Sequence, residues 1–170
     1  MWKLWEKWMK RINGLVENIT ALFLAVMVLL IFLQIISRAV FQSSFAWTEE
    51  LARYLMIWVT FLGASFAFQY GAHIGIEVVV NQLSPLLARL VKLCAAIACT
   101  VFFIVMIAKG LEIYDRAMIQ RSAAMGIPMG YVYTVIPLSG LLMLLNLIDV
   151  TLKEWRQDSG QNKTKEGEIG

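Results

Sequence analysis

The chain is poor in the residues on which catalytic and soluble domains rely. Of its 170 residues 16% are charged and 59% are apolar, whereas a soluble domain has about 25% and 45–50%. It has one histidine, His73, and cannot supply two axial histidines to a haem. It also lacks a glycine-rich phosphate loop and the H-E-x-x-H and G-x-S-x-G motifs. We therefore expect no enzyme activity, no cofactor and no metal site.

Cysteine is nearly as scarce. The chain has two, Cys94 and Cys99, and in a helix this spacing places them roughly 140° apart. They cannot pair within that helix, and they do not form a C-x-x-C redox motif. We interpret both as small packing residues. The composition as a whole excludes a disulfide-rich scaffold.

The charged residues nearly balance, and their positions are informative. The 15 Lys and Arg residues and 12 Asp and Glu residues give a net charge of +3, too small to indicate a nucleic-acid partner. Four windows are free of charge, and each is close to the roughly 17–25 apolar residues that cross a bilayer. We expect an all-α integral membrane protein in contact with lipid. Its four transmembrane helices form an antiparallel bundle, at about residues 18–38, 54–73, 90–110 and 128–150.

Two segments flank this membrane domain of residues 18–155. In residues 1–17 the apolar side chains share one helix face and the basic ones share the other, which is typical of an amphipathic helix at the membrane interface. A cytoplasmic extension of the first transmembrane helix explains the same pattern. Residues 156–170 are rich in Gly, Lys, Glu, Asn and Gln, and we expect a disordered tail.

Lys and Arg predict the orientation, because the cytoplasmic flanks of membrane proteins carry more of them. One side of the expected bundle holds Lys3, Lys7, Lys10, Arg11, Arg89, Lys92, Lys153, Arg156, Lys163 and Lys165. The other side holds Arg38, Arg53, Lys109, Arg116 and Arg121. We therefore expect both termini in the cytoplasm.

No expected span has a charged residue near its middle, where a carrier coupled to an ion usually keeps one. The ionisable residues nearest to the spans lie at span ends: Glu17, Arg38, Arg53, His73, Lys109 and Asp149. We therefore expect that the chain does not transport a solute by itself.

The second span and its end carry a stripe of small residues at four-residue spacing: Gly63, Ala67, Gly71 and Gly75. Such a stripe lets two helix backbones approach closely. It serves either packing inside the bundle or docking against a partner membrane protein, and the pattern is compatible with both. In the fourth span, Pro137 is expected to bend the helix, because it lacks a backbone donor and clashes one turn earlier.

The segment before the second span is polar. Thr48 is placed to cap a helix whose first turn holds Glu49 and Glu50. Arg53 lies three or four residues after both acids, and it can pair with either one or with a neighbouring chain. The aromatic residues expected at the level of the lipid headgroups are Trp47, Tyr54 and Trp58.

Several short motifs, taken in order, resemble one known family. They are Trp47-Thr-Glu-Glu-Leu-Ala-Arg-Tyr54, Phe61-Leu-Gly-Ala64, Gly71-Ala-His-Ile-Gly-Ile-Glu77, Gly126-Ile-Pro-Met-Gly-Tyr-Val-Tyr133, Ile136-Pro137-Leu-Ser-Gly140 and Leu142-Met143. With four spans and this length, they resemble the small membrane subunit (DctQ-like) of the tripartite ATP-independent periplasmic (TRAP) transporters over roughly residues 20–155.

The resemblance implies a role for a chain without a coupling group. In this family a large membrane subunit carries the substrate and sodium sites and moves as an elevator, and a soluble periplasmic protein delivers an organic acid. The small subunit braces the large one in the bacterial inner membrane and helps to dock the binding protein. The resemblance makes these residues candidates for the partner interface: Trp47, Glu49, Glu50, Arg53, Tyr54, His73 and Glu77, the last at a position where Asp is commoner.

Two other classes fit the spans less well. A small self-associating four-span exporter would need a carboxylate inside the membrane. An anchor subunit of a membrane oxidoreductase would need more than one histidine for a haem.

Overall fold

The computed structural model describes residues 2–41, 45–71 and 84–167. Within these residues the chain is helical and forms no named strand. Four helices are long and apolar enough to cross a membrane, so the expected all-α, four-span fold is confirmed. The helices are α1 (Trp2–Phe41), α2 (Ala46–Gly71), α4 (Pro85–Ala117), the short α5 (Gly130–Tyr133) and α6 (Val135–Gly167).

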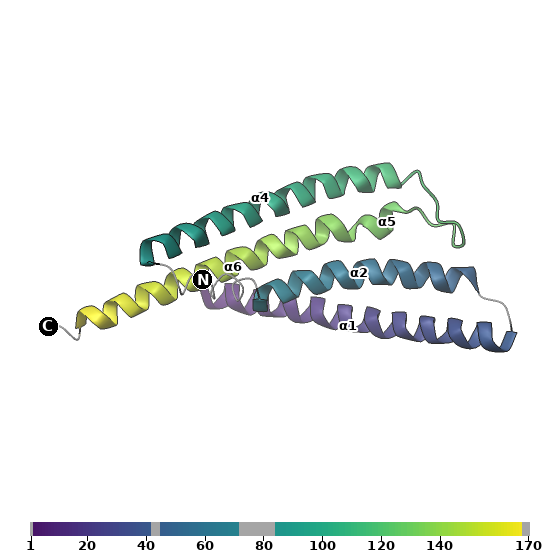
Figure 1. Ribbon diagram of the computed structural model, residues 1–170, viewed down its shortest axis with the longest axis horizontal. Coiled ribbons are helices and arrows are strands. Elements are labelled where there is room, and N and C mark those ends of the chain that lie inside the picture. The colour runs from purple at the N-terminus through teal and green to yellow at the C-terminus, as the bar shows by residue number, and fades with distance from the viewer. Residues whose placement is uncertain (1, 42–44, 72–83, 168–170) are drawn as a thin grey trace.

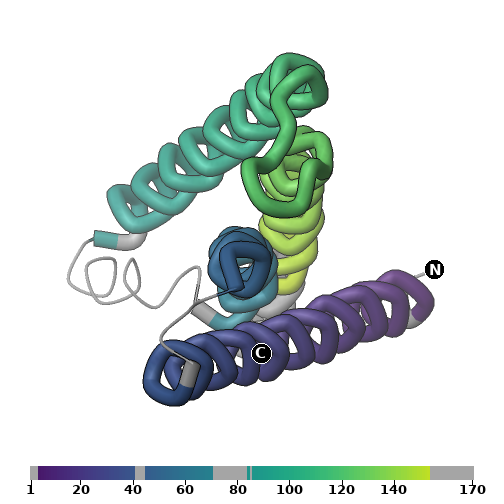
Figure 2. Tube along the Cα trace, turned by 90° about the vertical axis from the view of Figure 1, so that its right-hand side faces the viewer, coloured from purple at the N-terminus to yellow at the C-terminus, as the bar shows by residue number. Residues whose placement is uncertain are grey.

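The four long helices lie in a row (Figures 1 and 2). α1 packs on α2, α2 packs on α6, and α6 packs on α4. α1 and α4 run in one direction, and α2 and α6 run in the other. The row leaves α1 and α4 at its two edges, and each of them has a long apolar surface that the other described residues do not cover.

Two apolar clusters hold the row together. Val16, Leu62 and Val135 join α1, α2 and the start of α6. Phe103, Met143 and Leu147 join α4 to α6, where Phe68 of α2 also packs. Each buried aliphatic or aromatic side chain contributes about 1.5–3 kcal/mol in water. In a bilayer the contribution comes chiefly from close packing.

α1 is one continuous helix of 40 residues, which at 1.5 Å per residue is about 60 Å long. That is roughly twice the thickness of the hydrocarbon core. Residues 2–17 therefore continue the first span without a break. This is the arrangement in which the segment extends the first transmembrane helix. Met9, Asn13 and Val16 lie on its buried face at helical spacing.

α2 begins at Ala46, two residues before the expected cap. The prediction that Thr48 caps this helix is wrong. Thr48 is fully buried in the first turn, and its hydroxyl donates to the carbonyl of Phe45 at 2.7 Å. A cap would accept a hydrogen bond from a backbone N–H instead.

The fourth span is interrupted at Thr134, one turn before Pro137. Pro137 has no N–H to donate to the carbonyl of Tyr133, and its ring crowds that carbonyl. The disturbance expected from Pro137 thus takes the form of a break between α5 and α6. The backbone continues across it, because the N–H of Thr134 donates to the carbonyl of Gly130 at 3.0 Å.

The last helix includes most of the segment for which the composition predicts disorder. α6 continues as a helix to Gly167, whereas the composition predicts a disordered tail from residue 156. The segment mixes Lys, Glu and Gln, which have good helix propensity, with Gly, Ser, Asn and Asp, which do not. Extending an existing helix also avoids the cost of nucleation.

Candidate functional site

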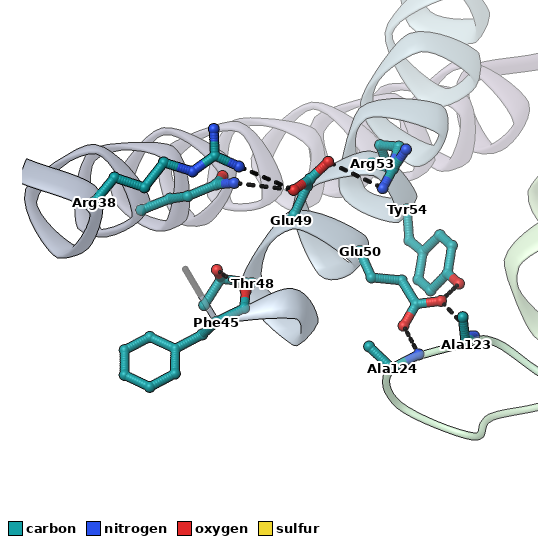
Figure 3. A network of polar contacts seen from close by, with 10 residues as sticks. Arg38, Phe45, Thr48, Glu49, Glu50, Arg53, Tyr54, Ala123 and Ala124 are labelled. Atoms are coloured by element: carbon teal, nitrogen blue, oxygen red, sulfur yellow. Dashed lines mark hydrogen bonds and ion pairs between the residues drawn. The ribbon is translucent and has the colours of Figure 1, made fainter. Parts of the chain in front are cut away.

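Two neighbouring carboxylates at the start of α2 point to different parts of the molecule (Figure 3). Glu49 turns towards α1, where it accepts hydrogen bonds from Arg38 Nη2 and Gln34 Nε2, each at 3.3 Å. It also accepts one from Arg53 Nη2 at 3.2 Å, one turn along its own helix. The pairing that the sequence left open for Arg53 is therefore with Glu49.

The contacts of Glu49 are exposed to solvent. The side chains of Arg38, Glu49 and Arg53 are 59%, 44% and 69% exposed. Ion pairs of this kind are worth only about 0–1 kcal/mol each. Their effect is mainly to fix the end of α1 against the start of α2, and they leave both guanidinium groups accessible from outside.

Glu50 turns the other way, towards the loop between α4 and α5 (Figure 3). Its carboxylate accepts hydrogen bonds from three successive backbone N–H groups, those of Ala123 at 3.0 Å and of Ala124 and Met125 at 2.9 Å. The hydroxyl of Tyr54 donates to the same carboxylate at 2.5 Å. Successive N–H groups that converge in this way form an anion-binding concavity, which the chain fills with its own side chain.

The loop around these N–H groups is folded tightly. The N–H of Ser122 donates to the carbonyl of Ile127 at 2.9 Å, and that of Gly126 donates back to Ser122 at 3.1 Å. Gly126 has a φ of +67°, a conformation that favours glycine. The guanidinium of Arg121 donates to the carbonyl of Gly126 at 3.0 Å. The loop is thus a compact hairpin that Glu50 attaches to α2.

The other candidate residues are only partly placed. Trp47, on the first turn of α2, is 44% exposed. Tyr54 joins the loop through Glu50 and through its hydroxyl, which lies 3.2 Å from Met129 Sδ. His73 and Glu77 lie outside the described residues.

The small-residue stripe is likewise described in part. A Cβ added at Gly63 would lie 3.9 Å from Thr20 Cγ2, so this position faces α1 at an ordinary contact distance. Ala67 is exposed. Gly71 is the last residue of α2, and Gly75 lies outside the described residues.

Tighter glycine contacts occur outside the small-residue stripe. A Cβ at Gly110 of α4 would lie 2.8 Å from Pro137 Cδ and 2.9 Å from Pro137 N. A Cβ at Gly140 of α6 would lie 2.9 Å from Ile107 Cγ1. These glycines have no four-residue pattern, and their neighbours in the sequence give no other signal of a close contact.

A second polar cluster, also missed, lies near the opposite end of the row. Asn13 of α1 and Asn146 of α6 are buried and hydrogen-bonded to each other. One turn further along α6, Asp149 is fully buried, and it accepts hydrogen bonds from Trp5 Nε1 at 3.1 Å and Lys153 Nζ at 2.5 Å. An amide within an otherwise apolar stretch was the signal for Asn146.

Neither polar cluster has the composition of a metal centre. In residues 2–41, 45–71 and 84–167, no group of three or more His, Cys, Asp or Glu side chains is arranged to hold a metal ion. Glu50 instead holds the backbone of a loop, and Glu49 holds two exposed arginines. This arrangement suits contact with another protein.

Comparison with known proteins identifies the family. Residues 27–157 match the family described as "Tripartite ATP-independent periplasmic transporters, DctQ component". A Haemophilus influenzae protein named as a TRAP transporter small permease protein is 31% identical over 137 residues, which cover 81% of this chain and 85% of that protein.

Two further relatives differ in length. The sialic acid TRAP transporter permease protein SiaT of Haemophilus influenzae is 30% identical over 141 residues, or 82% of this chain but 23% of SiaT. The C4-dicarboxylate TRAP transporter small permease protein DctQ of Vibrio cholerae is 29% identical over 111 residues, or 63% of this chain and 48% of that protein. With its four spans and with most of its length matched, the chain belongs to the DctQ family of TRAP transporter small permease subunits.

Proposed function

We propose that this small permease subunit braces a large, sodium-coupled elevator subunit and helps to dock a periplasmic substrate-binding protein, in a secondary transporter for organic acids. The observation that carries the proposal is the row of helices, whose two edges are apolar and, within residues 2–41, 45–71 and 84–167, uncovered. The subunit would lie in a bacterial inner membrane with both termini in the cytoplasm, as the Lys and Arg distribution predicts.

The edges of the row support the bracing role. In the most apolar 18-residue windows of α1 and α4, 6% of the residues are buried, against 44% in the window of α6. A helix with so little burial within its own chain faces either lipid or another membrane protein. A large partner subunit fits one edge, and lipid fits the other.

The length of SiaT supports a large partner. A segment similar to this chain makes up 23% of SiaT, so in that relative it is joined to a much longer polypeptide. We infer that the same association occurs here between separate chains.

The loop held by Glu50 supports the docking role. With cytoplasmic termini, the ends joined by Glu49 and Glu50 face the periplasm. There the hairpin presents Ile119, which is 87% exposed, beside the exposed Arg121. A preformed loop costs less ordering entropy on binding than a mobile one.

The names of two relatives support the proposed substrate class. SiaT is named for sialic acid and the Vibrio cholerae protein for C4-dicarboxylates, and both compounds are organic acids. We propose an organic acid here too, captured by the binding protein and carried by the large subunit.

The test is purification followed by uptake. The chain, tagged and extracted in mild detergent, should co-purify with a larger multi-span protein. Uptake of an organic acid into proteoliposomes should require both membrane proteins, a sodium gradient and the binding protein. Uptake by the large subunit alone at an undiminished rate would contradict the bracing role, and uptake without the binding protein would contradict the docking role.

A further inference from the structure

An apolar groove opens between the N-terminal end of α1 and α6. Its volume is about 370 Å³. Met9 is buried, whereas Leu4 and Trp8 are 62% and 65% exposed. The indole of Trp5 is held by its hydrogen bond to Asp149, so one wall is fixed. The groove is lined by Leu4, Trp5, Trp8, Met9, Ile12 and Leu145.

Basic side chains lie on the helix face next to the exposed edge of this groove. Lys7 follows Leu4 by three residues, and Arg11 follows Trp8 by three residues, so the two cations form a column beside the two exposed apolar residues. Lys7 and Arg11 are both exposed. Glu6 is the one acidic residue between Trp2 and Asn13, and the segment carries a net positive charge.

We place the groove at the level of the lipid headgroups, which requires α1 to be tilted in the bilayer, because its 40 residues extend over about 60 Å. The charge-free part of α1 begins at Asn18, and the groove residues precede it on the same continuous helix. Tryptophan is enriched at this depth because its ring is apolar and its N–H is polar. Arginine and lysine at this depth attract the phosphates of anionic lipids.

We propose that the groove and its basic column bind an anionic phospholipid. An acyl chain would lie along Trp8, Ile12 and Leu145, and the phosphate would contact Lys7 and Arg11, the latter with its planar fork of donors. The site goes beyond the proposed transport role, and it requires only that the chain spans a membrane. It uses apolar shape and positive charge together, whereas ordinary surrounding lipid needs only an apolar surface.

The contribution of the basic side chains Lys7 and Arg11 is tested by measuring which lipids the chain retains. The chain, with the partners that co-purify in mild detergent, is placed in nanodiscs of equimolar phosphatidylglycerol and phosphatidylcholine. It is then re-extracted, and the retained lipids are counted by native mass spectrometry. We expect preferential retention of phosphatidylglycerol. Lys7→Gln and Arg11→Gln should each lower it about fivefold, whereas Arg89→Gln, which removes an exposed cation near the start of α4, should not.

The groove itself is tested by Trp8→Ala against Leu22→Ala. Both side chains are exposed on α1, so neither change should prevent folding, but only Trp8 lines the groove. Trp8→Ala should release phosphatidylglycerol, and Leu22→Ala should retain it. Equal retention of the two lipids by the unmodified chain, or unchanged retention in Trp8→Ala and Lys7→Gln, would overturn the proposal and indicate that a protein partner covers the groove. Neither result would affect the uptake test of the transport role.

Discussion

Asn13 and Asn146 exchange reciprocal side-chain hydrogen bonds between α1 and α6. Asn13 Nδ2 donates to Asn146 Oδ1 at 2.8 Å, and Asn146 Nδ2 donates to Asn13 Oδ1 at 3.1 Å. The second N–H of Asn146 donates to the carbonyl of Ser65 on α2 at 2.7 Å. Three helices thus meet at one amide pair, whose residues are 5% and 1% exposed.

Replacing Asn146 should destabilise this junction. Asn146→Leu removes both donors and leaves the buried amide of Asn13 without its partner, which costs about 1–3 kcal/mol. We expect a lower midpoint of thermal unfolding in detergent. Asn18→Leu is the control, because Asn18 lies exposed on α1, the helix that carries Asn13. The double variant Asn13→Leu/Asn146→Leu should lose less than the two single losses added, and strict additivity would contradict the pairing.

The ion pair between the buried carboxylate of Asp149 and Lys153 predicts how variants at these two residues rank in stability. Lys153→Met leaves this carboxylate, which is fully buried, with the indole of Trp5 as its remaining partner among the described contacts. Because Lys153 is 35% exposed, we expect a loss of about 1–3 kcal/mol, below that of a fully buried pair. Asp149→Asn keeps an acceptor for Trp5 and should lose less.

Thermal unfolding of these variants tests whether the unpaired buried charge causes the loss of stability. Adding Asp149→Asn to Lys153→Met should restore stability, because the unpaired charge is removed. Lys109→Met is the matched control, since Lys109 pairs with Glu112 at an exposed site, and it should change stability by less than about 1 kcal/mol. A double variant less stable than Lys153→Met would contradict the argument.

Glu50 should control the order of the loop that it holds. In Glu50→Gln the side chain has one acceptor oxygen where the carboxylate has two, and its amide N–H would face a backbone N–H. Hydrogen exchange of the amides of Ala123, Ala124 and Met125 should therefore become about tenfold faster. Glu49→Gln is the control, because Glu49 contacts α1 and its own helix. Equal acceleration in both variants would contradict a specific role of Glu50.

The sequence predicts the fold because hydropathy and length are local properties. Four apolar windows without charge are enough to locate four spans, and the structure has helices at all four. The role of Thr48, in contrast, is not determined by its local sequence alone. Whether a threonine caps a helix depends on where the preceding residues begin to hydrogen-bond, and the carbonyl of Phe45 is already engaged.

The candidate site was predictable only in part for the same reason. The motif marks Glu49 and Glu50 as candidate interface residues. Their different partners depend on a loop more than 70 residues further along the chain. Spacing along one helix shows that Arg53 can reach both acids, but only the positions of α1 and the loop determine which acid is left for it.

The glycine contacts of α4 and α6 lead to a further prediction. Gly110→Ala would place a methyl group 2.8 Å from the ring and 2.9 Å from the backbone nitrogen of Pro137, and neither atom belongs to a flexible side chain that can move aside. We expect a loss of about 1–3 kcal/mol from forced separation of α4 and α6. Gly63→Ala should be tolerated, because its methyl group would meet Thr20 at 3.9 Å.

Gly110 and Gly63 differ in the space that an added side chain would find. A side chain larger than a methyl group at Gly63 therefore extends the test. Gly63→Leu should weaken the contact of α1 with α2 and reduce assembly of the transporter, without changing substrate preference among the complexes that survive. Assembly is measured by the amount of partner that co-purifies, and preference by competition between organic acids in proteoliposomes. A changed preference would show that this subunit lines the transport path, because a packing defect alone alters how much complex forms and leaves its selectivity intact.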